Sequence, residues 1–170
     1  MSLLAFIMSD LGVSRKASIG RIFLKYYFNM SFRLALNYRV GHYLHNHRSL
    51  INNLLILWLK KRQIKNFSCD ISYQCKIGYG VKFPHPVGIV IGVNSVIGNE
   101  VTIWQHVTLG SMGKFEKAYP TIENNVKLFA NCQILGAVTV CENSRVGASA
   151  VVISDVPKNA TAVGIPAKVI

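Results

Sequence analysis

Between Ile71 and Val152 the chain carries an apolar residue at every sixth position, interrupted only by a two-residue shift and by a polar loop. This loop starts at Ser111 and contains Gly113, and we expect it to project from its coil. The fourteen repeat positions are Ile71, Ile77, Phe83, Ile89, Ile91, Ile97, Ile103, Leu109, Ile122, Leu128, Ile134, Val140, Val146 and Val152. Because 51% of the chain is apolar, fourteen matches would arise by chance roughly once in ten thousand trials. A period of six matches neither a helix, which repeats every ~3.6 residues, nor a strand, which alternates every ~2. It is typical of a solenoid whose coils consist of hexads, each with one inward side chain.

Residues 1–66 carry no hexads and differ from the rest of the chain in charge. They hold eleven Lys/Arg residues and one acidic residue, Asp10, whereas the remainder holds eight Lys/Arg residues and six acids. Apolar residues at helical spacing predict two or three helices here, one of them over residues 50–61. A helical cap would cover the unpaired strand groups at the open end of a solenoid. We therefore divide the chain into a basic helical region, residues 1–66, and a β-helix domain, residues 67–170.

The uneven charge indicates an anionic partner, namely a membrane surface, an acidic polysaccharide or nucleic acid, and of these nucleic acid is not expected. The alternative is a solubilising face that binds nothing. The aromatic residues of this region either pack on the β-helix or another subunit, or form an interfacial helix face. The apolar run Leu54–Leu59 is far shorter than the ~20 residues a membrane span needs, and no secretory signal is evident. We expect a cytoplasmic protein, with peripheral association at the inner face of the membrane as an open alternative.

Several segments resemble the hexapeptide-repeat acyltransferases, which fold as a left-handed parallel β-helix. The matching segments are Asp70-Ile71, Lys76–Gly78, His85–Gly92 (HPVGIVIG), Gln105–Gly110 (QHVTLG) and Val156–Lys168 (VPKNATAVGIPAK). The branch that matches is that of the serine acetyltransferases and the related exopolysaccharide O-acetyltransferases of colanic-acid type. The resemblance implies a mainly β fold, a left-handed β-helix with a short N-terminal α-helical cap, and an enzyme that transfers acetyl groups.

His85 is the first candidate for a catalytic residue. It stands between Pro84 and Pro86 where the repeat shifts by two residues, and such an irregularity re-aims a side chain. Histidine titrates near neutral pH, so it can remove the proton of a hydroxyl that attacks a thioester. The resembling enzymes carry their general base at this position and pair it with the aspartate that Asp70 matches. From the residues alone, His85 could equally be an exposed corner histidine and Asp70 a cap on the first coil.

Other reactive side chains give weaker patterns. His106 is the rival base. The serine acetyltransferases commonly carry a serine at the matching position, so the resemblance implies a residue that lines the acceptor side or is exposed. No Cys or Ser stands beside a base in a nucleophile motif, so we expect direct transfer without an acyl-enzyme. The four cysteines lack a Cys-x-x-Cys pair and the histidines at 42, 45 and 47 form only a weak cluster. No metal is therefore expected.

The resemblance implies acetyl-CoA as the donor, bound in a groove between neighbouring subunits of a homotrimer. By position, it places Ser111, Ala130 and Ala148 along the pantetheine arm and Lys168 at the nucleotide phosphates. The chemistry of these residues agrees, because alanines leave room for the arm and a lysine answers phosphate charge.

The acceptor is inferred from the positions where the chain departs from the serine acetyltransferases. Those enzymes carry an Asp before the catalytic histidine and an Arg-His pair after the projecting loop, where this chain has Pro84, Ala118 and Tyr119. The charges that would hold an amino acid are thus missing, and Tyr119 and Trp104 could stack on a sugar ring. We therefore expect an acceptor hydroxyl on a saccharide, either a surface or capsular polysaccharide or its precursor. The alternatives are a serine O-acetyltransferase of cysteine biosynthesis and a non-catalytic β-helix that serves as a scaffold or polyanion binder.

Overall fold

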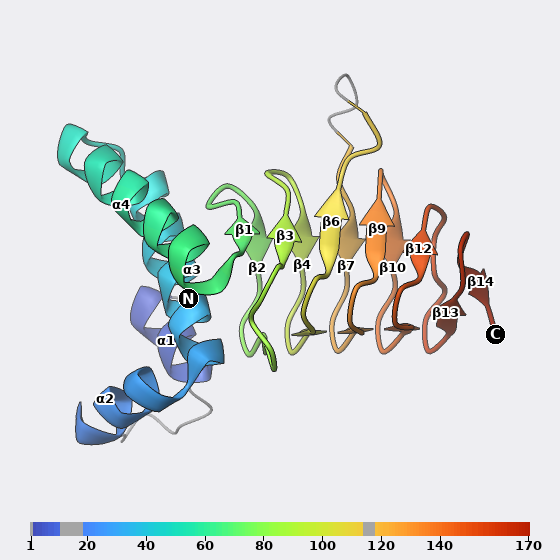
Figure 1. Cartoon of the computed structure of the whole chain (residues 1–170), viewed down its shortest axis with the longest axis horizontal. Coiled ribbons are helices and arrows are strands. Elements are labelled where there is room, and N and C mark those ends of the chain that lie inside the picture. Colours follow the sequence, from blue (N-terminus) through green and yellow to red (C-terminus); the bar gives the residue numbers. More distant parts are fainter. Residues whose placement is uncertain (1, 11–18, 114–117) are drawn as a thin grey trace.

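The computed structural model describes residues 2–10, 19–113 and 118–170 of the chain. A unit of helices stands at one end of a long stack of β-coils, and the C-terminus lies at the other end of the stack (Figure 1). Of the predicted projecting loop, residues 114–117 lie outside the described ranges. The predicted domain boundary near residue 66 falls next to the end of the last helix, at Phe67.

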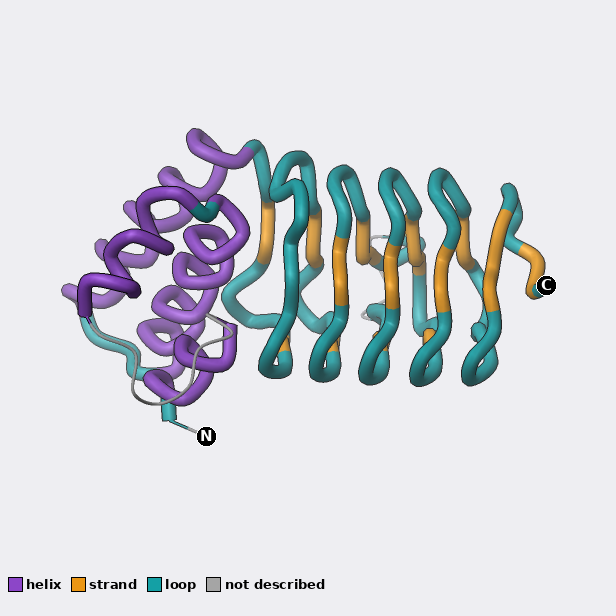
Figure 2. Tube along the Cα trace, turned by 90° about the horizontal axis from the view of Figure 1, so that it is seen from below, coloured by secondary structure: helices purple, strands orange, loops and turns teal. Residues whose placement is uncertain are grey.

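The β-coils consist of short strands that stack into three sheets, one on each side of the solenoid (Figure 2). The strands are β1 (Asp70–Ile71), β2 (Lys76–Ile77), β3 (Val90–Ile91), β4 (Val96–Ile97), β5 (Thr102–Ile103), β6 (Thr108–Gly110), β7 (Thr121–Ile122), β8 (Lys127–Leu128), β9 (Gln133–Leu135), β10 (Thr139–Val140), β11 (Arg145–Val146), β12 (Val151–Val152), β13 (Thr161–Val163) and β14 (Lys168–Val169). The sheets have the strand orders β1-β3-β6-β9-β12, β10-β7-β4-β2 and β14-β13-β11-β8-β5. Every pairing is parallel except β13 with β14. The predicted parallel β-helix is confirmed.

All fourteen predicted hexad residues lie in the core of the solenoid. The most exposed of them, Ile77, retains 7% of its accessible surface, and the others retain 2% or less. Full burial of an aliphatic side chain contributes about 1.5–3 kcal/mol, so these fourteen side chains together contribute strongly to the stability of the stack. The hexad pattern therefore predicts the core correctly.

The strand register locates the two-residue shift of the repeat. Lys82 bridges to Thr102, a step of 20 residues, whereas Val90 pairs with Thr108, a step of 18. Eighteen residues are three hexads, one for each side of the solenoid. The two extra residues consequently lie between positions 82 and 90, in the corner that carries His85.

The described part of residues 1–66 is helical throughout, apart from short connections. The helices are α1 (Leu3–Asp10), α2 (Ile19–Phe28), α3 (Met30–Asn46) and α4 (Leu50–Phe67). The side chains of Asn29 and Ser49 cap α3 and α4 by accepting hydrogen bonds from the amides of Phe32 and Asn52. The sequence predicted two or three helices and ended the last one at residue 61. It missed α1, which is short and carries no amphipathic pattern, and it stopped α4 too early.

Buried polar contacts join α3 and α4 to the first coil. The side chain of Gln63 donates to Asn37 Oδ1 (3.1 Å) and accepts from the amide of Ile71 (2.8 Å), while the Tyr73 hydroxyl also donates to Asn37 Oδ1 (2.8 Å). These groups are withdrawn from water, so each unmade bond would cost about 1–3 kcal/mol. The helical unit is therefore packed on the coil that precedes the His85 corner.

The aromatic residues of the helical unit differ in burial. Phe32 and Tyr38 are buried, as expected for packing on the β-helix, and the Tyr38 hydroxyl donates to the carbonyl of Cys75 (2.7 Å). The exposed set comprises Phe23, Tyr27, Phe28, Tyr43 and Trp58. Within the described ranges, no helix is both long and apolar enough to cross a membrane.

Candidate active site

His85 occupies the irregular corner between the buried residues Phe83 and Ile89. Its carbonyl accepts a hydrogen bond from the amide of Val87 (2.8 Å), which closes a tight turn. Pro84 and the buried Pro86 hold the backbone on either side. The His85 side chain is exposed, and neither ring nitrogen has a hydrogen-bond partner among the residues that the structure describes. The two extra residues of the repeat thus present an imidazole to solvent from a rigid scaffold.

A groove beside His85 is shared between this corner and the helical unit. One side consists of residues 84–87 and the other of residues 28–31, at the junction of α2 and α3; the groove has a volume of about 360 Å³. The Ser31 hydroxyl accepts a hydrogen bond from the amide of Phe83 (3.0 Å), which fixes the two sides together. Ligand pockets typically span about 300–1,000 Å³, so the groove is large enough for a small acceptor. The sequence gave no signal for this wall, because residues 28–31 are far from the hexads along the chain.

Asp70, the expected partner of His85, lies at the start of β1 and pairs with Lys60 of α4. The ammonium group of Lys60 also donates to the carbonyl of Ile71 (3.0 Å) and to Gln63 Oε1 (3.3 Å). The side chain of Asp70 is 62% exposed, so it is accessible from solvent as well as from Lys60. The predicted pairing of Asp70 with His85 stays a prediction, and Lys60 is a neighbour that the sequence did not reveal.

His106 lies one coil further along the same corner. Its amide donates to the carbonyl of Val87 (2.9 Å), and its backbone is left-handed, with φ of 58°. Histidine tolerates this conformation better than most residues. The ring lies against Gly88, where a β-carbon would come within 2.6 Å of Cε1 and nearer still to Nδ1. The rival base therefore contacts the His85 turn from the next coil.

The four residues expected at the donor lie at three places on one chain. Ala130 and Ala148 occupy neighbouring turns of one corner, where the Ser149 amide donates to the Ala130 carbonyl (2.9 Å). Ser111 follows β6, and its hydroxyl donates to the carbonyl of Gly113 (3.4 Å). Lys168 stands exposed on β14. One chain alone does not bring these residues together in a closed pocket.

The two aromatic residues predicted to stack on a sugar ring, Trp104 and Tyr119, are both in contact with other parts of the protein. Trp104 stacks on Phe129 of the next coil, with the ring centroids 4.7 Å apart. Tyr119 lies against Gly92, where a β-carbon would come within 2.6 Å of its ring. One face of the Trp104 ring is thus covered by Phe129, and the Tyr119 ring is in contact with the backbone at Gly92.

Three of the four cysteines are poor candidates for a covalent nucleophile. Cys69, Cys75 and Cys132 are buried, and burial raises the pKa of the Cys75 and Cys132 thiols to about 12. Because the thiolate is the reactive form, these thiols are inert near neutral pH. This favours the direct transfer that the sequence predicts.

Comparison with known proteins relates the chain to one group of enzymes. Residues 119–154 match the family "Bacterial transferase hexapeptide (six repeats)". The chain is 35% identical over 173 aligned positions to the serine acetyltransferase of Buchnera aphidicola, covering 99% of this chain and 62% of that protein. It is 49% identical over 73 residues to the serine acetyltransferase of Helicobacter pylori strain J99, covering 42% of this chain and 43% of that protein.

Solved structures extend this likeness to the helical unit. Soybean serine acetyltransferase in complex with serine superposes with a TM-score of 0.85 at 35% identity, covering 99% of this chain and 70% of that one. The serine acetyltransferase of Neisseria gonorrhoeae superposes equally well, at 32% identity, covering 99% of this chain and 66% of that one. The chain thus spans only about half of the length of the curated relatives given above. The fold, the repeats and these matches show that the chain belongs to the hexapeptide-repeat acetyltransferases with a left-handed β-helix.

Proposed function

We propose that this protein is an acetyl-CoA-dependent O-acetyltransferase in which His85 is the general base. The observation that carries the proposal is the placement of His85, which the irregular corner presents to a groove between the coils and the helical unit. His85 takes the proton of the acceptor hydroxyl as its oxygen attacks the thioester carbonyl. The new C–O bond forms, the C–S bond breaks, and the proton passes from the imidazolium to the departing CoA thiolate.

Asp70 serves this step by orienting the imidazole of His85. A carboxylate on one ring nitrogen holds the tautomer whose other nitrogen can accept a proton, and it stabilises the imidazolium that forms. Asp70 must then divide its two oxygens between His85 and Lys60. The Lys60 ammonium, which also donates to the carbonyl of Ile71, holds the carboxylate at the start of β1.

Serine is the first candidate for the acceptor. Its support is the family relationship, because the relatives given above are named serine acetyltransferases and the soybean structure contains serine. The groove beside His85 has room for an amino acid. A free serine hydroxyl would lie against His85 with the remainder of the molecule in the groove.

A saccharide hydroxyl is the second candidate, and it rests on the side chains around the base. Pro84 precedes His85, and Phe28 and Met30 contribute exposed apolar surface to the opposite wall. Ala118 and Tyr119 stand after the projecting loop. An amino acid needs charged groups for its carboxylate and ammonium, whereas apolar and aromatic walls suit the face of a sugar ring.

Acetyl-CoA lies along the coils in a groove between chains of a homotrimer. The scattered positions of Ser111, Ala130, Ala148 and Lys168 on one chain support a groove that a second chain completes. Small side chains line the pantetheine arm and Lys168 meets the phosphates.

The deciding experiment follows release of the CoA thiol with serine, and then with a panel of saccharides. Turnover with serine that saturates below millimolar concentration identifies the first candidate, whereas turnover with a saccharide alone identifies the second. The double variant Ala118→Arg with Tyr119→His sharpens the test. Its turnover with serine should exceed that of the native chain if the native side chains at these two positions disfavour serine. His85→Ala is the negative control. If no acceptor gives turnover above this control, the proposed transfer of acetyl to serine or to these saccharides is wrong.

A further inference from the structure

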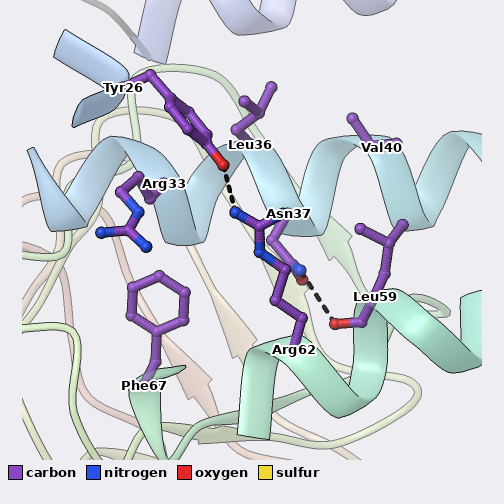
Figure 3. A pocket seen from close by; sticks show the side chains of 8 residues that line it. All are labelled: Tyr26, Arg33, Leu36, Asn37, Val40, Leu59, Arg62 and Phe67. Atoms are coloured by element: carbon purple, nitrogen blue, oxygen red, sulfur yellow. Dashed lines mark hydrogen bonds between the residues drawn. The ribbon is translucent and has the colours of Figure 1, made fainter. Parts of the chain in front are cut away.

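A small cavity in the helical unit is distinct from the groove at His85. It lies between α2, α3 and α4 and has a volume of about 110 Å³ (Figure 3). Apolar side chains of Leu36, Val40 and Leu59 form part of its lining, while Arg33 and Arg62 bring two guanidinium groups to it.

Both guanidinium groups are held in place by Tyr26. Arg62 donates a hydrogen bond to the Tyr26 hydroxyl. Arg33 lies 5.8 Å from the centroid of the Tyr26 ring and 5.7 Å from that of Phe67. Cation–π contacts of this kind orient a guanidinium without neutralising it. In Figure 3 Arg33 comes from α3 and lies over Phe67, while Arg62 comes from α4 and points towards the Tyr26 hydroxyl.

Neither guanidinium has a carboxylate partner among residues 2–10, 19–113 and 118–170. The acids in these ranges are committed elsewhere: Asp10 pairs with Arg39, Asp70 with Lys60, Glu100 with Lys82 and Glu142 with Lys158, while Asp155 and Glu123 accept backbone amides. Residues 11–18 contain no acidic residue, and Glu116 lies outside the described ranges. Two half-buried positive charges over an apolar floor thus lack a counter-charge from the helical unit.

We infer that this cavity binds a small oxyanion, of the size of phosphate, sulfate or a short carboxylate. Two guanidinium groups offer paired N–H donors whose geometry matches such oxygens. Pockets for drug-sized ligands span about 300–1,000 Å³, so this cavity is too small for a nucleotide or a sugar chain. The polar atoms of Asn37 are already bonded to Leu59, Gln63 and Tyr73, which leaves the arginines as the recognition groups. The site is independent of acetyl transfer.

The test is calorimetric titration of the full chain with potassium phosphate, sulfate and acetate, at an ionic strength kept constant with chloride. We expect at least one of the three anions to bind saturably, with a stoichiometry of one anion per chain. Binding of phosphate or sulfate alone assigns a tetrahedral oxyanion, and binding of acetate assigns a carboxylate. Hydrogen bonds to charged groups contribute enough that Arg33→Gln or Arg62→Gln should weaken binding by about tenfold or more.

Controls separate this site from general salt effects, because sulfate and phosphate stabilise many proteins by exclusion from their surface. Lys61→Gln and Lys65→Gln remove exposed charges from the same helix as Arg62 and should leave the affinity unchanged. Arg33→Lys retains the charge without the paired donors, so it should bind more weakly than the native chain but more tightly than Arg33→Gln. The inference is wrong if no anion binds saturably, or if both glutamine variants, folded by circular dichroism, bind as tightly as the native chain.

Discussion

Gly88 is the point at which the His85 turn and the next coil are most sensitive to one added methyl group. Its φ is +67°, a left-handed conformation that costs an L residue about 1–2 kcal/mol. The added β-carbon would also meet the ring of His106. Gly88→Ala should therefore lower the free energy of unfolding by the conformational ~1–2 kcal/mol plus the cost of displacing the ring. Acetyl transfer should fall as well, because the turn that carries His85 must move.

A double-mutant cycle separates the two contributions. In the double variant Gly88→Ala with His106→Ala, the imidazole ring is absent. After the loss in unfolding free energy caused by His106→Ala alone is subtracted, only the conformational cost of alanine at position 88 should remain. Gly80→Ala is the matched control, since Gly80 also has φ of +67° but its β-carbon would meet the carboxylate end of Glu100, which can swing away. It should cost stability and spare activity. Urea unfolding and release of the CoA thiol measure the two quantities. Strictly additive effects in the cycle, or equal losses of activity in both glycine variants, would refute the reasoning.

Three further changes test the proposed chemistry and the basic region. His85→Ala should reduce acetyl transfer about 10²–10⁴-fold with little change in CoA affinity, and retention of native turnover would remove His85 as the base. Asp70→Asn should lower the rate and alter its pH profile, because an amide can hold the wrong imidazole tautomer; an unchanged profile would make Asp70 a structural residue. If the basic region binds anionic membranes, Lys61→Glu with Lys65→Glu should weaken sedimentation with anionic vesicles at low salt, where each charge contributes about 1 kcal/mol. Equal sedimentation of variant and native chain would show that these lysines only solvate the surface.

The core of the β-helix could be read from the sequence because each hexad residue reports its own position. One apolar side chain per hexad fixes both which side chain points inward and how the coils stack. The burial of residues such as Leu128 could therefore be predicted from the repeat alone. The irregular corner was equally visible, since a two-residue shift in a strict repeat has one physical meaning. His85 was therefore locatable before the fold was known.

The surroundings of His85 could not be predicted in the same way. The wall formed by Phe28 and Met30 depends on how α2 and α3 pack on the first coil, and no periodic pattern records that contact. The same holds for Lys60, whose ion pair with Asp70 joins two segments of different structure. Long-range polar contacts of this kind are set by tertiary packing rather than by local sequence.

The stacking of the coils fixes the distances between residues along the axis of the β-helix. The strand neighbours of one face run from the bridge at Lys82 through β5, β8, β11 and β13 to β14, which carries Lys168. Adjacent strands lie about 4.8 Å apart, so the His85 corner and Lys168 are separated along the axis by roughly 24 Å. This distance changes only in whole coils. In the proposed donor groove, the axial distance between the reacting thioester and the phosphates can therefore change only in steps of one coil. Inserting one coil of three hexads after β12 would lengthen the donor that fits the groove by one such step.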